Sequence, residues 1–159
     1  MTARALSAAV ALVCAVAWGA DDFYAVREAA EKGDALAQLL IAKAYETGRG
    51  AESNAVEAVR WYRKAAEQGN ATAQKNLGAC YFAGDGVKAD RREAVRWFRK
   101  AAEQGHADAQ FSMGYCFAKG LGVEKNEAEA MKYFRKAAEQ GQREAQRILK
   151  GVQAPKKDF

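Results

Sequence analysis

The chain has 159 residues, of which 50% are hydrophobic and 28% charged, and its formal net charge is +5 at neutral pH. These are ordinary values for one soluble domain that buries a core, so a single domain is expected. The excess of positive charge is too small to indicate a nucleic-acid partner by itself.

The first 20 residues differ from the rest of the chain. Arg4 precedes an apolar run over 5–18, small residues follow, and charged residues begin at Asp21. This order is typical of a secretory signal peptide. The alternative is an uncleaved anchor, but the run is shorter than the roughly 20 residues that a membrane span requires. We therefore expect residues 1–20 to be a cleaved signal peptide, with no membrane insertion afterwards and a periplasmic or secreted location in the bacterial envelope.

A repeat of 36 residues dominates the rest of the chain. Segments 61–69, 97–105 and 133–141 read WYRKAAEQG, WFRKAAEQG and YFRKAAEQG. A fixed period of this length indicates a solenoid, in which each unit buries its apolar face against the next. The predicted divisions are a repeat domain at 21–150, full repeats at 31–66, 67–102 and 103–138, and a partial repeat at 139–150.

Each repeat contains two predicted helices. The first begins at a polar residue after a glycine, and the second begins at an Asx residue followed three positions later by glutamate, as in a capping box. Each helix ends at a glycine, which takes the left-handed conformation that closes a helix. The expected starts are Asp34, Asn70 and His106 for the first helices, and Asn54, Asp90 and Asn126 for the second. The predicted fold is all-α.

A helical period also predicts the core. The expected packing residues are Ala58, Val59, Trp61, Tyr62, Ala65 and Ala66 in the second helix, and Ala37, Gln38, Ile41, Ala42 and Tyr45 in the first. Cys80 and Cys116 are one period apart, and stacked helices lie about 8–10 Å from one another. A disulfide requires Cα atoms within about 7 Å, so we expect two buried thiols, with a disulfide as the alternative that an oxidising compartment would favour.

Residues 73–105, AQKNLGACYFAGDGVKADRREAVRWFRKAAEQG, resemble a Sel-1-like repeat, a subclass of the tetratricopeptide-like superfamily. The resemblance covers residues 31–138. It implies an α-solenoid, a right-handed superhelix of three helix-turn-helix repeats. Half repeats at about 22–32 and 139–150 are expected to cap its ends, and residues 151–159 to form a flexible tail.

In this superfamily the first helices line the concave face of the superhelix, so their unpacked side is expected to face a groove. Residues on that side differ most among the repeats, as a surface shaped to one partner would. The candidate partner-binding residues are Leu39, Lys43, Lys75, Phe82, Phe111, Tyr115 and Lys119. Aromatic residues beside lysines would give an apolar anchor with cationic edges for a peptide. Phe82 and Phe111 fit equally well beneath adjacent helices.

No catalytic, metal or cofactor site is expected. His106 is the only histidine, and the chain has no phosphate-binding loop or nucleophile motif. Basic residues recur along the second helices, but glutamates lie three or four positions from them, so local ion pairs explain them better than a nucleic acid does. We predict a monomeric, non-enzymatic module that binds a peptide or protein.

Two alternatives stay open. Cysteine-rich relatives of the family are associated with binding or hydrolysing β-lactams, but they carry a cysteine pair in each repeat and this chain does not. The second alternative is an inhibitor or regulator of an envelope or secreted protein. Only the identity of the partner would distinguish this role from that of a scaffold.

Overall fold

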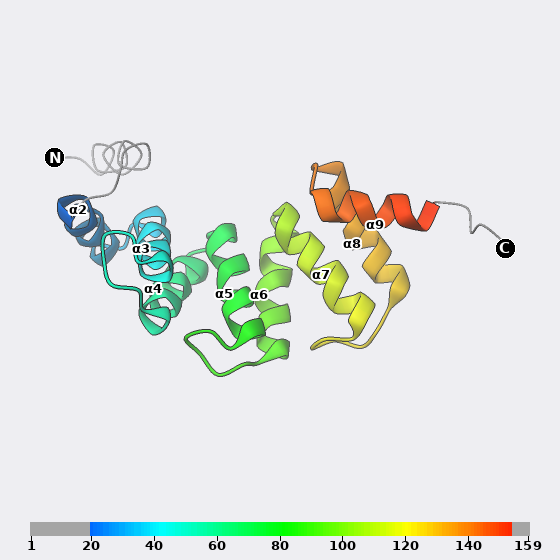
Figure 1. Ribbon diagram of the computed structural model, residues 1–159, viewed down its shortest axis with the longest axis horizontal. Coiled ribbons are helices and arrows are strands. Elements are labelled where there is room, and N and C mark those ends of the chain that lie inside the picture. Colours follow the sequence, from blue (N-terminus) through cyan, green and yellow to red (C-terminus); the bar gives the residue numbers. More distant parts are fainter. Residues whose placement is uncertain (1–19, 154–159) are drawn as a thin grey trace.

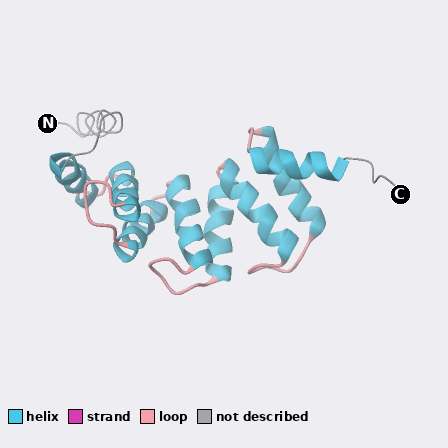
Figure 2. Cartoon of the chain, in the orientation of Figure 1, coloured by secondary structure: helices cyan, strands magenta, loops and turns pink. Residues whose placement is uncertain are grey.

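A computed structural model describes residues 20–153, and every regular element in that range is an α-helix. The helices follow one another along an elongated molecule, with α2 and α9 at opposite ends (Figures 1 and 2). Their bounds are α2 Ala20–Glu31, α3 Ala35–Thr47, α4 Ala55–Glu67, α5 Ala71–Ala83, α6 Arg91–Glu103, α7 Ala107–Lys119, α8 Glu127–Glu139 and α9 Arg143–Gln153. The predicted α-solenoid is confirmed, whereas the predicted signal peptide falls almost entirely outside the described residues.

Each helix packs chiefly against the helices just before and after it in the chain. Helices α3 and α4, α5 and α6, and α7 and α8 form the three hairpin repeats. The half repeats at the two ends are α2 and α9. Stability in such a stack is approximately the sum of the interfaces between neighbours.

The structure confirms the predicted helix starts but only half of the expected capping box. The side chain of Asn54 accepts the backbone N–H of Glu57 at 3.1 Å. The backbone N–H of Asn54 donates to the carbonyl of Tyr45 at 2.8 Å, and the same bond recurs in the other repeats. Because this donor is already used, the Glu57 carboxylate pairs instead with Arg60 at 3.4 Å.

The predicted helix ends and core faces also agree with the structure. Gly48 closes α3 in the left-handed conformation, with φ of 73°, and the equivalent glycines close α5 and α7. All six predicted core residues of α4 are buried. Helix α9 continues to Gln153, three residues beyond the predicted end of the domain, and residues 154–159 of the expected tail lie outside the described range.

Small residues allow the two helices of a repeat to lie close together. A Cβ atom on Gly114 of α7 would lie 2.7 Å from the ring of Phe134 on α8. The first repeat has Ala42 at the equivalent position, and the facing aromatic residue there is Tyr62. The hydroxyl of Tyr62 donates to the carboxylate of Glu46 at 2.8 Å.

A row of buried glutamines, here called the glutamine row (Gln38, Gln74 and Gln110), connects successive repeats. The Nε2 of Gln74 donates to the carbonyl of Ala66 in the preceding helix at 3.0 Å, and its Oε1 accepts from Gln104 at 2.8 Å. The other two glutamines make the equivalent pair of bonds. Each therefore adds a second hydrogen bond to a carbonyl at a helix end, which also accepts the backbone N–H of the glycine that follows the helix.

The two cysteines of the described chain are buried free thiols, as expected. Burial raises the pKa of both Cys80 and Cys116 to about 11. Because the thiolate is the reactive form, thiols with so high a pKa are poor nucleophiles at neutral pH. They act as small packing groups, like Ala44 at the equivalent position of the first repeat.

Candidate functional site

The exposed side of the first helices carries four of the predicted partner-binding residues as accessible polar or aromatic groups. Lys43, Tyr115 and Lys119 are exposed, and Lys75 is half-buried. The Nζ of Lys75 donates to the side chain of Asn76 at 3.3 Å. Tyr115 is 41% exposed, whereas the phenylalanines of the first helices are half-buried.

The two candidate phenylalanines are half-buried, so each takes part in the core and keeps some accessible surface. The ring of Phe82 lies 6.4 Å from that of Phe98, between centroids, and the guanidinium of Arg91 lies 5.8 Å from its centroid. The ring of Phe111 lies 5.7 Å from that of Phe134. The interpretation as core residues therefore holds in part, and partner binding by the accessible part of each ring stays a prediction.

Leu39 has a different environment from the other candidates. It is only 7% exposed and belongs to the core formed around α3 and α4. Its helical position predicted exposure on the unpacked side of the first helix, and this prediction is wrong because Leu39 packs in the core. The accessible apolar residue on α3 is Leu36, which is 42% exposed.

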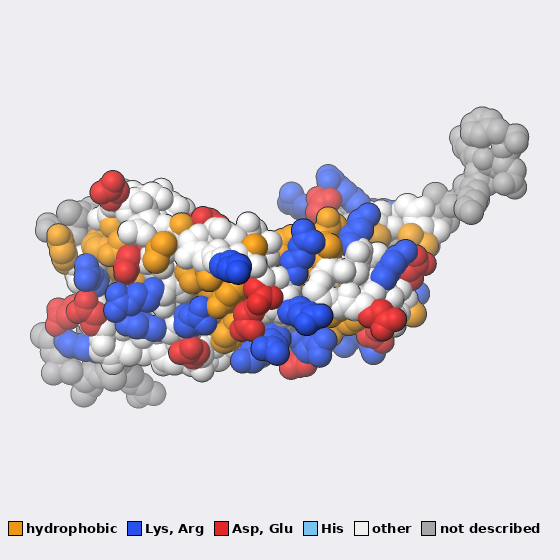
Figure 3. Space-filling view, turned by 90° about the horizontal axis from the view of Figure 1, so that it is seen from below, with side chains coloured by type: hydrophobic (Ala, Val, Ile, Leu, Met, Phe, Trp, Pro, Cys, Tyr) orange, Lys and Arg blue, Asp and Glu red, His pale blue; other side chains and the backbone are white. Residues whose placement is uncertain are grey.

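Local ion pairs explain only part of the basic surface of the second helices. Arg60, Arg96 and Lys132 each pair with a glutamate three residues earlier, at 3.4, 3.2 and 3.6 Å. Lys64 and Lys100 instead lie over tryptophan rings, about 4 Å from the ring centroids. Acidic and basic side chains are interspersed along the face seen in Figure 3.

The described part of the chain contains no cluster of three or more His, Cys, Asp or Glu side chains placed to hold a metal ion. Over the same residues, none of the helices combines the length and the apolar character needed to span a bilayer.

The fold and the exposed first-helix face define a class of protein, an α-solenoid scaffold built from helical-hairpin repeats. Three consecutive matches to the Sel1 repeat cover residues 35–70, 71–106 and 107–142. The chain belongs to the Sel1 repeat family, whose repeats are in general non-catalytic modules for protein–protein interaction. The matched period is the predicted one, with each repeat beginning four residues later than in the division at 31, 67 and 103.

Several solved bacterial structures are similar to this chain. They include c5321, a protective antigen of uropathogenic Escherichia coli with an SLR fold (43% identity, TM-score 0.75, 76% of this chain and 26% of that one). A Sel1 repeat protein from Oxalobacter formigenes is 49% identical, with a TM-score of 0.69, over 72% of this chain and 47% of that one. Helicobacter pylori cysteine rich protein B is 27% identical, with a TM-score of 0.67, over 81% of this chain and 96% of that one. The chain thus spans less than half the length of the first two proteins, and no curated protein matches it.

Proposed function

We propose that the protein binds an extended segment of another protein on the groove surface, defined as the first-helix residues Lys43, Lys75, Phe82, Phe111, Tyr115 and Lys119. The general role of Sel1 repeats supports this function. The observation that carries it is the exposure of a large aromatic side chain on this surface. Tyr115 is 41% exposed and lies on the first helix of the third repeat.

The chemistry of the groove surface fits an apolar side chain with polar groups around it. Tyrosine is enriched among the residues that dominate binding energy, because it combines a large rigid ring with a hydroxyl group. Lys119 lies one helical turn after Tyr115 and is also exposed. A ligand side chain packed on the tyrosine ring would therefore have a cation nearby for a carbonyl or carboxylate group.

The binding test compares the wild-type chain with a Tyr115→Ala, Lys119→Gln variant. Phe111→Ala is a poorer choice, because it would also remove the ring contact with Phe134. Tyr24→Ala is the matched control, since Tyr24 is 67% exposed but lies on α2, outside the groove surface. Immobilised wild-type and control proteins should retain the same discrete partner from a bacterial envelope extract, and the double variant should lose it while its circular dichroism is unchanged. Equal retention by all three proteins would disprove binding at the groove surface.

We also propose that the protein is exported. The charged start, the apolar run and the small residues of the N-terminal segment support this location. Expression of the full chain in a bacterium should yield a shortened protein outside the cytoplasm, with its new N-terminus measured by intact mass. A full-length protein confined to the cytoplasm would contradict export without affecting the binding proposal.

A further inference from the structure

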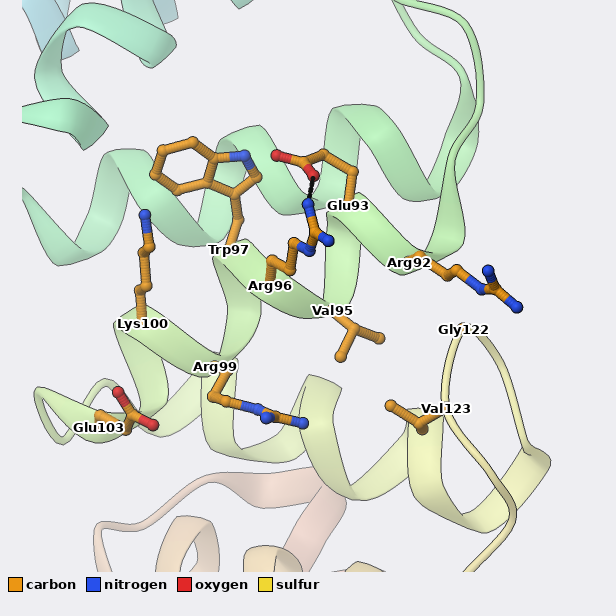
Figure 4. Close-up of a pocket in the computed structure, with 10 residues that line it drawn as sticks. All are labelled: Arg92, Glu93, Val95, Arg96, Trp97, Arg99, Lys100, Glu103, Gly122 and Val123. Atoms are coloured by element: carbon orange, nitrogen blue, oxygen red, sulfur yellow. Dashed lines mark hydrogen bonds and ion pairs between the residues drawn. The ribbon is translucent and has the colours of Figure 1, made fainter.

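A pocket of about 580 Å³ lies beside α6 and shares no residue with the groove surface (Figure 4). Part of its lining is apolar, from Val95 on α6 and Val123 in the turn before α8. Its basic lining residues are Arg92, Arg96, Arg99 and Lys100. We call this the α6 pocket.

Two of these four cations are already engaged. Arg96 pairs with Glu93 at 3.2 Å, and the Nζ of Lys100 lies 4.2 Å from the centroid of the Trp97 ring. Within residues 20–153, the side chains of Arg92 and Arg99 have neither an ion pair nor a hydrogen bond. Figure 4 shows both side chains pointing toward the turn before α8. Arg92 points toward Gly122, and Arg99 points in the direction of Val123.

The neighbouring repeat shows why Arg99 has no partner. Its equivalent in α4, Arg63, donates a hydrogen bond to the hydroxyl of Tyr81 and lies 5.5 Å from the centroid of that ring. One repeat later, Phe117 occupies the position of Tyr81 and stacks on Tyr133, with 5.8 Å between the ring centroids. The missing hydroxyl leaves the Arg99 guanidinium without the acceptor that its counterpart has.

Arg92 and the indole N–H of Trp97 also distinguish this repeat, although the first repeat has a tryptophan, Trp61, at the position of Trp97. The residues equivalent to Arg92 are Val56 and Ala128, so the second arginine of the pocket occurs in the middle repeat alone. Trp97 is 6% exposed, and its indole N–H is the one buried side-chain donor or acceptor without a partner that the described chain shows.

We propose that the α6 pocket binds an acidic peptide segment, in which a glutamate or aspartate lies next to an aliphatic residue. Arginine and carboxylate groups form strong charge-assisted hydrogen bonds, often two at a time, and Arg92 and Arg99 are the cations available for them. The aliphatic side chain would pack against Val95 and Val123. This site is independent of the groove surface.

A nucleic acid fits the α6 pocket less well than an acidic peptide. Glu93 and Glu103 are part of its lining and would repel a continuous phosphate backbone. Bases bind single-strand sites by stacking on open aromatic faces, but Lys100 already covers one face of Trp97.

The probe is a fluorescein-labelled peptide of sequence leucine-glutamate-glutamate-leucine, titrated with the full chain at low salt and followed by anisotropy. It should bind, whereas the same peptide with glutamine in place of glutamate should not. Arg99→Gln should weaken binding about tenfold, the size expected for a charge-assisted bond. Arg135→Gln, the equivalent change in the third repeat, should leave binding unchanged, and so should Tyr115→Ala in the groove surface.

A second variant tests the pocket without altering its charge. Phe117→Tyr would restore the hydroxyl that holds Arg63 in the first repeat, and should therefore compete with the peptide for Arg99 and weaken binding several-fold. Circular dichroism should be unchanged, because Tyr45 and Tyr81 already occupy this position in the other repeats. Equal binding of the glutamate and glutamine peptides, undiminished binding by Arg99→Gln, or tighter binding of a single-stranded oligonucleotide would overturn the proposal.

Discussion

Residues at equivalent positions of the three repeats show how single side chains adjust a common framework. At the start of the first helices, Asp34 accepts the backbone N–H of Ala37 at 2.8 Å. In the third repeat, the Nδ1 of His106 accepts from Ala109 at a longer 3.4 Å. Burial lowers the pKa of His106. The imidazole can accept this N–H only while it is neutral, so this cap depends on pH.

We predict that His106→Asn stabilises the protein by up to about 1 kcal/mol, since asparagine is among the best N-cap residues. The histidine pKa is lower in the folded chain than in the unfolded chain. Acidification below about 6.5, the ordinary pKa of histidine, therefore protonates the unfolded chain first and destabilises the wild type. Urea denaturation at pH 5 and pH 8 checks both effects, and the gain from asparagine should be larger at pH 5. A gain that is equal at the two pH values would contradict the titration of His106.

Gly114 is expected to resist even the smallest enlargement. Alanine is favoured over glycine within helices by about 1 kcal/mol, but its Cβ would lie 2.7 Å from the Phe134 ring. We expect Gly114→Ala to lower the free energy of unfolding by about 1–3 kcal/mol through overpacking. Gly151→Ala is the control, because nothing lies within 4 Å of a Cβ there, and it should be neutral or stabilising. Thermal and urea denaturation of both variants would measure the difference, and a stabilised Gly114→Ala protein would refute the close contact.

At the scale of the helices, the sequence predicted which sides pack but not the hydrogen bonds that join one helix to the next. The sequence placed Gln38 and its equivalents on the packing side, since their helical positions are fixed by the period. It did not predict the hydrogen bonds of the glutamine row, because their partners include a backbone carbonyl and a glutamine 30 residues away. Helical periodicity shows which side is buried, but not which polar atoms meet across an interface.

Gln110→Leu should destabilise the protein by about 1 kcal/mol, because it removes the buried hydrogen bond to the carbonyl of Ala102, which keeps only the backbone N–H of Gly105, and the bond from the amide of Gln140. Gln146→Leu is the matched control. Gln146 donates the equivalent bond to Ala138 at 3.1 Å but is exposed, so water can replace it and the loss should stay below about 0.5 kcal/mol. Urea denaturation should separate the two variants, and equal losses would show that burial of the glutamine row contributes nothing.

At the scale of the whole molecule, the sequence predicted the architecture more completely than the candidate site. The framework residues define the solenoid, because they recur in every repeat and predict the same helical hairpin each time. The site depends on residues that differ from their equivalents in the other repeats. The effect of such a difference is seen only when the residues that surround it in the structure are known. Arg99 looked like one member of a paired basic row, and its lack of a partner follows from Phe117 on another helix. The signal in the sequence was the change from Tyr81 to Phe117 at equivalent positions, because it removes a hydroxyl group that could accept a hydrogen bond from an arginine.

The ends of the stack should open before its middle. Helix α9 packs chiefly on α8, whereas α5 lies between α4 and α6 and packs on both. Local stability follows the number of interfaces that a helix shares. In native-state hydrogen exchange, the amides of α9 should therefore exchange faster than those of α5 and α7. Uniform protection along the chain would show that the protein unfolds as one cooperative unit.

The glutamine row also restricts how such a protein can change in length during evolution. Each buried amide joins the helix before it to a residue 30 positions later, so a gain or loss of a few residues within a helix would separate donor from acceptor. Duplication or deletion of a complete 36-residue unit keeps every pair together. Growth of the lineage by whole repeats is thus the route that this bonding pattern permits.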